Sequence, residues 1–166
     1  LGGRLAFCTI HLSADSLGDA TLIDFIADSI NRNPRVPVAK LCFTLRDDTL
    51  TGNPQQAARC LESLRALGCR TAIDHGNGRQ IGYIDQLRKL PINLFKLDGS
   101  QFARIVDDQV EQMLAETAIR LAKLNGARTL VSEIDSEAQA TVWRRLGADY
   151  LQGQAIAKPS PVPFRV

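Results

Sequence analysis

The sequence has no apolar run of the roughly 18 residues that a membrane-spanning helix needs, so it predicts no membrane segment. The sequence also lacks a large excess of positive or of negative charges. Its 20 basic and 18 acidic residues leave a net charge of +2, too little to favour nucleic acid or an anionic membrane as a partner. No linker or low-complexity tract divides the 166 residues. We therefore expect one globular domain over residues 1–166.

Paired cysteines are absent too. Cys8, Cys42, Cys60 and Cys69 form no CxxC motif, and each stands in an apolar segment. This pattern predicts buried free thiols in a reducing compartment rather than a metal site or a disulfide framework. The first thirteen residues alternate and lack a small-residue cleavage pattern, so we interpret them as a strand and not as a signal peptide. A cytoplasmic location is the expectation.

What the sequence does contain is a repeated alternation of strand-like and helix-like segments. Strands are predicted at residues 5–12, 38–45, 69–74, 91–98, 127–133 and 148–153, and helices at 19–33, 53–68, 81–90, 107–126 and 136–147. Connections of this length imply parallel strands joined by right-handed crossovers. The proline-rich end from residue 158 is expected to be extended or loop.

Polar residues gather at the carboxyl ends of the predicted strands. In parallel α/β folds the ligand site lies outside these ends, and polar groups within a covered strand are costly. Six strand ends in register therefore predict one shared pocket. The residues concerned are His11, Ser13, Thr44, Arg46, Asp74, Lys96, Asp98, Glu133 and Gln152.

Five motifs, in order and with matching spacing from residue 7 to 161, resemble EAL-domain cyclic-di-GMP phosphodiesterases. "LRALGCRTAIDHGNG" resembles LRxLGxxIALDDFGTG, and "LPINLFKLD" resembles LPVDxLKID. "TLVSEIDSEAQ" resembles VVAEGVETEEQ, "LGADYLQGQAIAKPSP" resembles LGCDxxQGYxFxKPxP, and "IHLSADSL" resembles VNLSPxxL. The resemblance implies a modified (β/α)8 barrel of the TIM type. Active members hydrolyse cyclic-di-GMP with two Mg²⁺ or Mn²⁺ ions.

Several metal-ligand positions of that family carry other residues here. His11 stands at the Asn of NLS, and Thr44 stands at the first Glu of ExTE. Asp74 and His75 stand at the DDFG pair, and the phenylalanine that follows is deleted. The EAL segment itself would lie before Leu1, so the resemblance covers about two thirds of a normal domain. The resemblance therefore implies an incomplete barrel of about six mostly parallel strands.

Other family positions are retained. Lys96 matches the catalytic lysine of KID, Glu133 matches the Glu of AEGVE, and Gln152 matches the Gln of QGY. Asp135 stands at the second Glu, because the segment is one residue short. Without metals, Lys96 has two alternative roles: it binds a phosphate, or it pairs with Glu133 or Asp74.

Two carboxylates, Asp74 and Glu133, cannot offset the charge of two divalent ions. The expectation is therefore an inactive domain without a metal cofactor, whose vestigial metal positions are His11, Thr44, Asp74, His75 and Glu133. The alternative is an active phosphodiesterase with an altered Mn²⁺ or Zn²⁺ site at His11, Asp74, His75 and Glu133. A different barrel enzyme that uses Lys96 as base or nucleophile is a third hypothesis.

An inactive domain would act in signalling as a cyclic-di-GMP receptor or as a protein-docking module. The residues expected to line a ligand pocket are Arg79, Lys96, Glu133 and Gln152. Affinity is expected to be weak, because the arginine of the EAL segment is absent. A six-stranded part of a barrel also leaves open edges, so a protein partner or another domain of the same regulator is expected to cover them.

Overall fold

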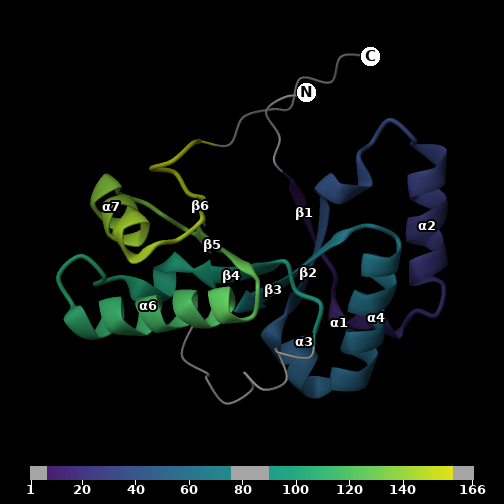
Figure 1. Cartoon of the computed structure of the whole chain (residues 1–166), viewed down its shortest axis with the longest axis horizontal. Coiled ribbons are helices and arrows are strands. Elements are labelled where there is room, and N and C mark those ends of the chain that lie inside the picture. Colours follow the sequence, from purple (N-terminus) through teal and green to yellow (C-terminus); the bar gives the residue numbers. More distant parts are fainter. Residues whose placement is uncertain (1–6, 76–89, 159–166) are drawn as a thin grey trace.

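The computed structural model describes residues 7–75 and 90–158, with His75 described by its backbone alone. Six strands form one sheet in the order of the sequence, and every neighbouring pair is parallel. All six predicted strands are confirmed (Figure 1). They are β1 (Cys8–His11), β2 (Leu41–Arg46), β3 (Arg70–His75), β4 (Leu94–Asp98), β5 (Arg128–Ser132) and β6 (Tyr150–Leu151).

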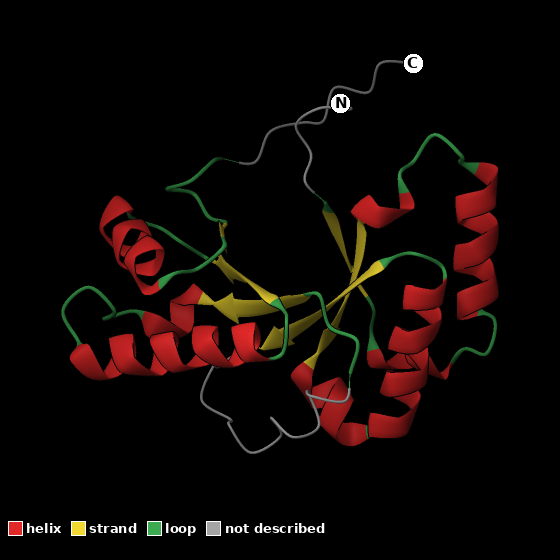
Figure 2. Ribbon diagram, in the orientation of Figure 1, coloured by secondary structure: helices red, strands yellow, loops and turns green. Residues whose placement is uncertain are grey.

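Helices follow most of the strands and lie outside the sheet, with α2 and α4 on one flank and α6 and α7 on the other (Figure 2). Four of the predicted helices are confirmed: α2 (Leu22–Arg32), α4 (Pro54–Ala66), α6 (Gln109–Leu124) and α7 (Glu137–Leu146). The fifth, predicted at 81–90, falls almost wholly outside the described residues. No described helix is long and apolar enough to cross a membrane.

Short helices that the sequence analysis does not predict follow three strands directly. They are α1 (Ala14–Gly18), α3 (Asp47–Gly52) and the 3₁₀ helix η2 (Gly99–Phe102), and a further 3₁₀ turn, η1 (Val38–Lys40), precedes β2. Each is too short to show a helical repeat of apolar residues, which is the signal that reveals longer helices. Helices α1, α3 and η2 shorten the βα connections at the carboxyl ends of the strands.

The longer helices begin and end at capping residues. The Asn53 side chain accepts a hydrogen bond from the Gln56 N–H, and Pro54 occupies the first turn of α4, as the sequence predicts. Ser136 caps α7, which ends at Gly147 in the left-handed conformation (φ 90°). These caps fix the point at which each helix turns back toward the sheet.

The sheet has two unlike faces, because successive side chains of a strand point to opposite sides. One face packs against the helices in a large apolar core, which contains Phe43 and Leu45 of β2 and the buried Trp143 of α7. The other face carries a smaller cluster, made of Cys42, Ala72, Leu94 and Leu130. The helix-covered face therefore supplies most of the burial, and the inner face is free to carry polar residues near the strand ends.

The inner face curls until its two edges meet at the amino-terminal ends of the strands. Phe7, just before β1, and Tyr150 of β6 make an edge-to-face contact with ring centroids 5.2 Å apart. Arg70 lies over the Phe7 ring at 5.8 Å, and Arg128 lies over the Tyr150 ring at 5.9 Å. The six strands thus form an incomplete barrel, and two aromatic rings and two guanidinium groups join its two edges at the amino-terminal ends of the strands.

The cysteines are buried at three positions out of four, and all four are free. Burial raises the pKa of Cys42 to about 11 and also raises the pKa values of Cys60 and Cys69. The prediction of a buried thiol is wrong for Cys8, which is exposed. Because β1 is an edge strand with one neighbour, its side chains lack the second wall that covers those of β2 and β3.

Replacing Leu64 by alanine should lower the free energy of unfolding by about 2–5 kcal/mol, because this α4 side chain is fully buried in the core and leaves a cavity. Leu124→Ala at the end of α6 is the matched control, since its side chain is 77% exposed. It should change stability by no more than about 0.5 kcal/mol. Urea denaturation followed by circular dichroism compares the two, and equal losses would contradict this description of the core.

Candidate functional site

A polar cavity of about 300 Å³ lies at the carboxyl ends of the four central strands. This volume is at the lower end of the range found for ligand pockets. Strands β2 to β5 and the residues that follow them supply every lining residue. These are Arg46, Asp47, Asp74, Lys96, Asp98, Ser132 and Glu133.

Strand register explains why residues far apart in the sequence meet here. In the strand register, Arg46 of β2 lies opposite Asp74 of β3, and Asp74 lies opposite Lys96 of β4. Asp98 pairs with Ser132 across β4 and β5. Paired residues of parallel strands point to the same face, so these side chains all project from the inner face of the half-barrel.

An ion pair joins the two central residues of the cavity. The ammonium Nζ of Lys96 donates a hydrogen bond to Oδ2 of Asp74 at 3.2 Å. The two side chains are only 15% and 18% exposed. Of the two carboxylates that the sequence offers as partners of Lys96, Asp74 and not Glu133 forms the ion pair. A charge pair this sheltered from water is held by its own attraction, because neither partner is well solvated alone.

Thr44 lies on the same face of β2, two residues before Arg46. It pairs in register with His11 of β1 and is 1% exposed. Its hydroxyl Oγ1 has no hydrogen-bond partner in the described part of the chain. A buried hydroxyl without a partner is costly, so this position holds a polar group where packing alone would favour an apolar one.

Glu133 has a strained backbone. Its φ of 55° makes it the only non-glycine residue in the described ranges with a positive φ. Hydrogen bonds on both sides hold this conformation: the Gln152 N–H donates to the Val131 carbonyl at 2.8 Å, and the Ile134 N–H donates to the Gln152 carbonyl at 3.1 Å. Strain of this kind persists only where its surroundings enforce it, and it is common at binding sites.

Not all the predicted site residues reach the cavity. His11, the last residue of edge strand β1, and Gln152, which directly follows edge strand β6, are exposed, and neither lines the cavity. Arg79 lies outside the described residues, and so does the side chain of His75. The cavity thus brings together Asp74, Lys96 and Glu133 from the predicted set.

Two further lining residues, Arg46 and Asp98, stand at predicted strand ends. They fall within family motifs, Arg46 at the Thr of ExTE and Asp98 at the Asp of KID, but the resemblance assigns neither of them a role. Arg46 pairs with Asp48 of α3 at 2.9 Å, and the carboxylate of Asp98 accepts hydrogen bonds from the Ser100 N–H and hydroxyl at 2.9 and 2.7 Å. Their position at the carboxyl end of a strand, on the face of Lys96 and Asp74, is the signal that reveals them.

Comparison with known proteins agrees with this geometry. The family model described as EAL domain matches residues 2–159. The chain belongs to the EAL domain family. Cyclic di-GMP phosphodiesterase PdeF of Escherichia coli is 28% identical over 123 residues, which are 74% of this chain and 16% of PdeF. An uncharacterised protein of Azorhizobium caulinodans is 27% identical over 92% of this chain and 20% of its own length. This EAL domain thus spans about a fifth or less of these relatives.

Solved structures of EAL domains share the fold. The FimX EAL domain of Pseudomonas aeruginosa, solved bound to c-di-GMP, superposes with a TM-score of 0.84 at 25% identity and covers 93% of this chain. A c-di-GMP complex of the PaMucR phosphodiesterase gives a TM-score of 0.85 at 23% identity over 97% of this chain. Only 62% and 65% of those chains are matched. The six strands are therefore an incomplete TIM-like barrel, as the sequence predicts.

The described residues do not fit a metal centre of the kind that EAL phosphodiesterases use. Within residues 7–75 and 90–158, no three His, Cys, Asp or Glu side chains come close enough together to hold a metal ion. Asp74 is engaged by the Lys96 ammonium, and Thr44 offers only an uncharged hydroxyl. Divalent ions such as Mg²⁺ need several carboxylate oxygens that are free of competing cations.

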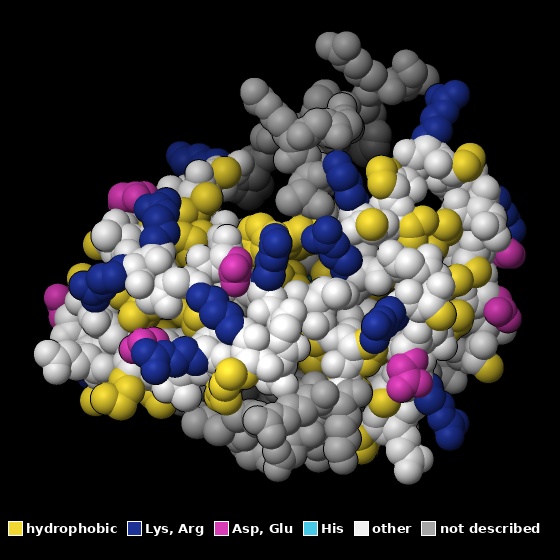
Figure 3. Space-filling view, viewed as in Figure 1, with side chains coloured by type: hydrophobic (Ala, Val, Ile, Leu, Met, Phe, Trp, Pro, Cys, Tyr) yellow, Lys and Arg dark blue, Asp and Glu magenta, His cyan; other side chains and the backbone are white. Residues whose placement is uncertain are grey.

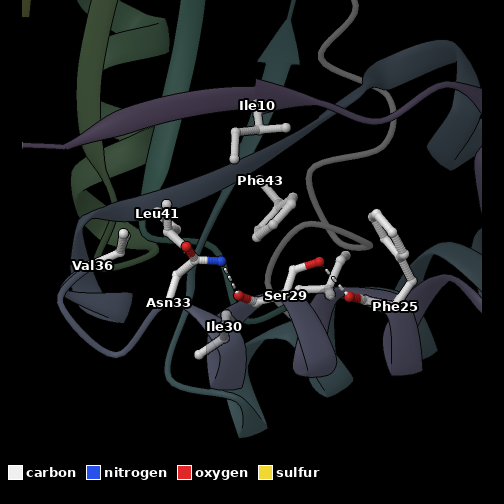
Figure 4. A pocket seen from close by; sticks show the side chains of 9 residues that line it. Ile10, Phe25, Ser29, Ile30, Asn33, Val36, Leu41 and Phe43 are labelled. Atoms are coloured by element: carbon white, nitrogen blue, oxygen red, sulfur yellow. Dashed lines mark hydrogen bonds between the residues drawn. The ribbon is translucent and has the colours of Figure 1, made fainter. Parts of the chain in front are cut away.

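A second cavity, of about 310 Å³, differs in character from the first. It lies between α2 and the first two strands, and Ile10, Phe25 and Phe43 are among its lining residues (Figure 4). Its two polar side chains turn back onto their own helix, since Ser29 Oγ donates to the Phe25 carbonyl at 2.7 Å and Asn33 Nδ2 donates to the Ser29 carbonyl at 2.8 Å. This groove offers no polar group to a nucleotide, so the polar cavity is the candidate site.

The face seen in Figure 3 carries both acidic and basic side chains. Acidic side chains are interspersed with basic ones, apart from a few basic side chains around an apolar patch near the centre. This mixture agrees with the net charge of +2.

A double-mutant cycle on Lys96→Met and Asp74→Asn should show that the two residues are energetically coupled. Each single change leaves a poorly solvated partner and should cost about 1–3 kcal/mol, whereas the double change should cost less than the sum. The exposed pair Arg32 and Asp28, 3.6 Å apart on α2, is the matched control and should show coupling of no more than about 0.5 kcal/mol. Equal coupling in the two pairs, measured by urea denaturation, would contradict the sheltered ion pair.

Replacing Glu133 by glycine should raise the free energy of unfolding by up to about 1 kcal/mol, because glycine adopts a positive φ without steric cost. Asp135→Gly is the control at a neighbouring exposed position whose φ is not positive. It should lower stability by about 0.4–1 kcal/mol through the entropy of the unfolded chain. Thermal melts of both variants check the opposite signs, and a destabilised Glu133→Gly variant would refute the strain.

Proposed function

We propose that this EAL domain is a catalytically inactive regulatory domain that binds cyclic-di-GMP weakly in the polar cavity. The ion pair between Lys96 and Asp74 is the observation that carries the proposal. It gives the cavity a fixed polar floor and at the same time occupies a carboxylate that a catalytic metal would need. The c-di-GMP complexes of the FimX and PaMucR EAL domains support the ligand class.

Loss of hydrolysis follows from charge. A two-metal site must hold about four positive charges while it activates a water and clamps a phosphate. Here Lys96 already neutralises Asp74, and Thr44 contributes no charge. Asp74 and Glu133 are the two carboxylates retained at the family's metal-ligand positions, and of these only Glu133 is exposed. These groups can hydrogen-bond to a dinucleotide, but they cannot balance two divalent ions.

The proposed contacts use both signs of charge in the cavity. Lys96 is a cation near a bound phosphate, and the carboxylate of Glu133 can accept hydrogen bonds from the N–H groups of guanine. Gln152 and Arg79, at the edge and outside the described residues respectively, complete the proposed set. Because the cavity is small and Lys96 is already paired, we expect low affinity.

Titration calorimetry with cyclic-di-GMP should give a dissociation constant weaker than about 1 µM, the same in EDTA and in Mg²⁺, because no metal bridges the protein and the phosphate. Chromatography after incubation in Mg²⁺ and then in Mn²⁺ should show no linear dinucleotide. Lys96→Ala should weaken binding further, and Lys123→Ala on the exposed surface of α6 is the control.

Turnover near 1 s⁻¹, a rate typical of slow enzymes, would overturn the proposal in favour of a phosphodiesterase with altered metals. About one zinc or manganese ion per chain by elemental analysis would point the same way. No heat of binding at any concentration would reject the receptor function and leave protein docking as the better account of an inactive EAL domain.

A further inference from the structure

Among the described residues that line the polar cavity, only Arg46 has the following combination of properties. It ends β2 beside Asp74 in the strand register, it lines the cavity, and its side chain is 70% exposed. Its planar guanidinium carries several N–H donors in a fixed fork that matches two oxygens of a phosphate. Arg46 stands at the Thr of the ExTE motif, and the resemblance assigns it no role there.

Lys96, the second cation of the cavity, is less available to a ligand than Arg46. Lys96 is sheltered from water and spends a hydrogen bond on Asp74, so a ligand must compete with a carboxylate at 3.2 Å for it. Arg46 is instead paired with Asp48, whose side chain is 61% exposed, and water can replace that partner at little cost. Among the lining residues that the structure describes, Arg46 is the cation most available to an incoming anion.

Because of the charge balance of the cavity, a bound anion needs a contact with an available cation such as Arg46. Two cationic side chains line it against four carboxylates, those of Asp47, Asp74, Asp98 and Glu133. A phosphodiester entering this cavity meets a formal excess of negative charge, and Lys96 is already offset by Asp74. An anion can be held only where an unburied cation faces the cavity.

We propose that Arg46 is the principal phosphate-binding residue of this site, and that Asp48 competes with the phosphate for its guanidinium. This assignment rests on the proposed function, because it takes a phosphodiester of cyclic-di-GMP as the ligand of the same cavity. Lys96 then serves mainly to neutralise Asp74, and its charge is only a secondary attraction for the phosphate. Binding exchanges the Arg46–Asp48 pair for an Arg46–phosphate pair and leaves the Lys96–Asp74 pair intact.

Four variants test the assignment by titration calorimetry with cyclic-di-GMP, and inorganic pyrophosphate is a second probe that has no base. Arg46→Ala should weaken binding of both probes about tenfold or more, and Arg46→Lys should give an intermediate loss, since an ammonium cannot make the forked contact. Asp48→Asn should strengthen binding about two- to fivefold by releasing the guanidinium. Arg32→Ala is the matched control for charge, because Arg32 is 78% exposed and pairs with Asp28 on α2.

Arg46→Ala is expected to fold, because its side chain is exposed, and circular dichroism verifies this for each variant. Binding by Arg46→Ala within twofold of Arg32→Ala would overturn the role of Arg46 while leaving the receptor function in place. Weaker binding by Asp48→Asn would overturn the competition. If the unchanged protein binds neither probe, the receptor function and the assignment to Arg46 both fail.

Discussion

The shared register of the parallel strands is the constraint on which this EAL domain depends. It directs alternate side chains of β2 to β5 to the helices and to the inner face, and it brings the carboxyl ends of the four strands to the same side of the sheet. The large core on the helical side fixes that register, because a slip of one residue would place Phe43 and Leu45 on the inner face and polar neighbours among the helices. Packing of the core thus determines which side chains line the cavity.

The Lys96–Asp74 pair converts this geometry into a particular kind of site. Within a sheltered wall of strands, an isolated carboxylate would attract a metal ion, and an isolated ammonium would attract a phosphate. Joined at 3.2 Å, the two groups satisfy each other and leave the cavity polar but not strongly charged at its floor. Under the proposed function, ligand selectivity would then depend on Arg46 and Glu133 at the rim, whose side chains are exposed to solvent.

Most of the fold could be predicted from the sequence because its signals are local. Apolar runs, capping residues such as Asn53 and helix-ending glycines mark the strands and the long helices. Helices α1 and α3 were not predicted, because five or six residues give no periodicity. The partner of Lys96 needs the pairing of two strands 22 residues apart, and the exposure of Cys8 needs the knowledge that β1 is an edge. The family motifs predicted site roles for Lys96 and Glu133, whereas Arg46 stands at the Thr of ExTE and was predicted only as a polar residue at a strand end.

The polar cavity is carried entirely by strands that have a neighbour on each side. Its lining comes from β2 to β5 and their loops, whereas the two edge strands meet through Phe7 and Tyr150 at the opposite rim. The residues that line the cavity and the residues at the edges of the sheet are therefore separate sets. Substitutions along β1 or β6 replace no residue that lines the cavity, and substitutions of the lining residues leave the contact between Phe7 and Tyr150 in place.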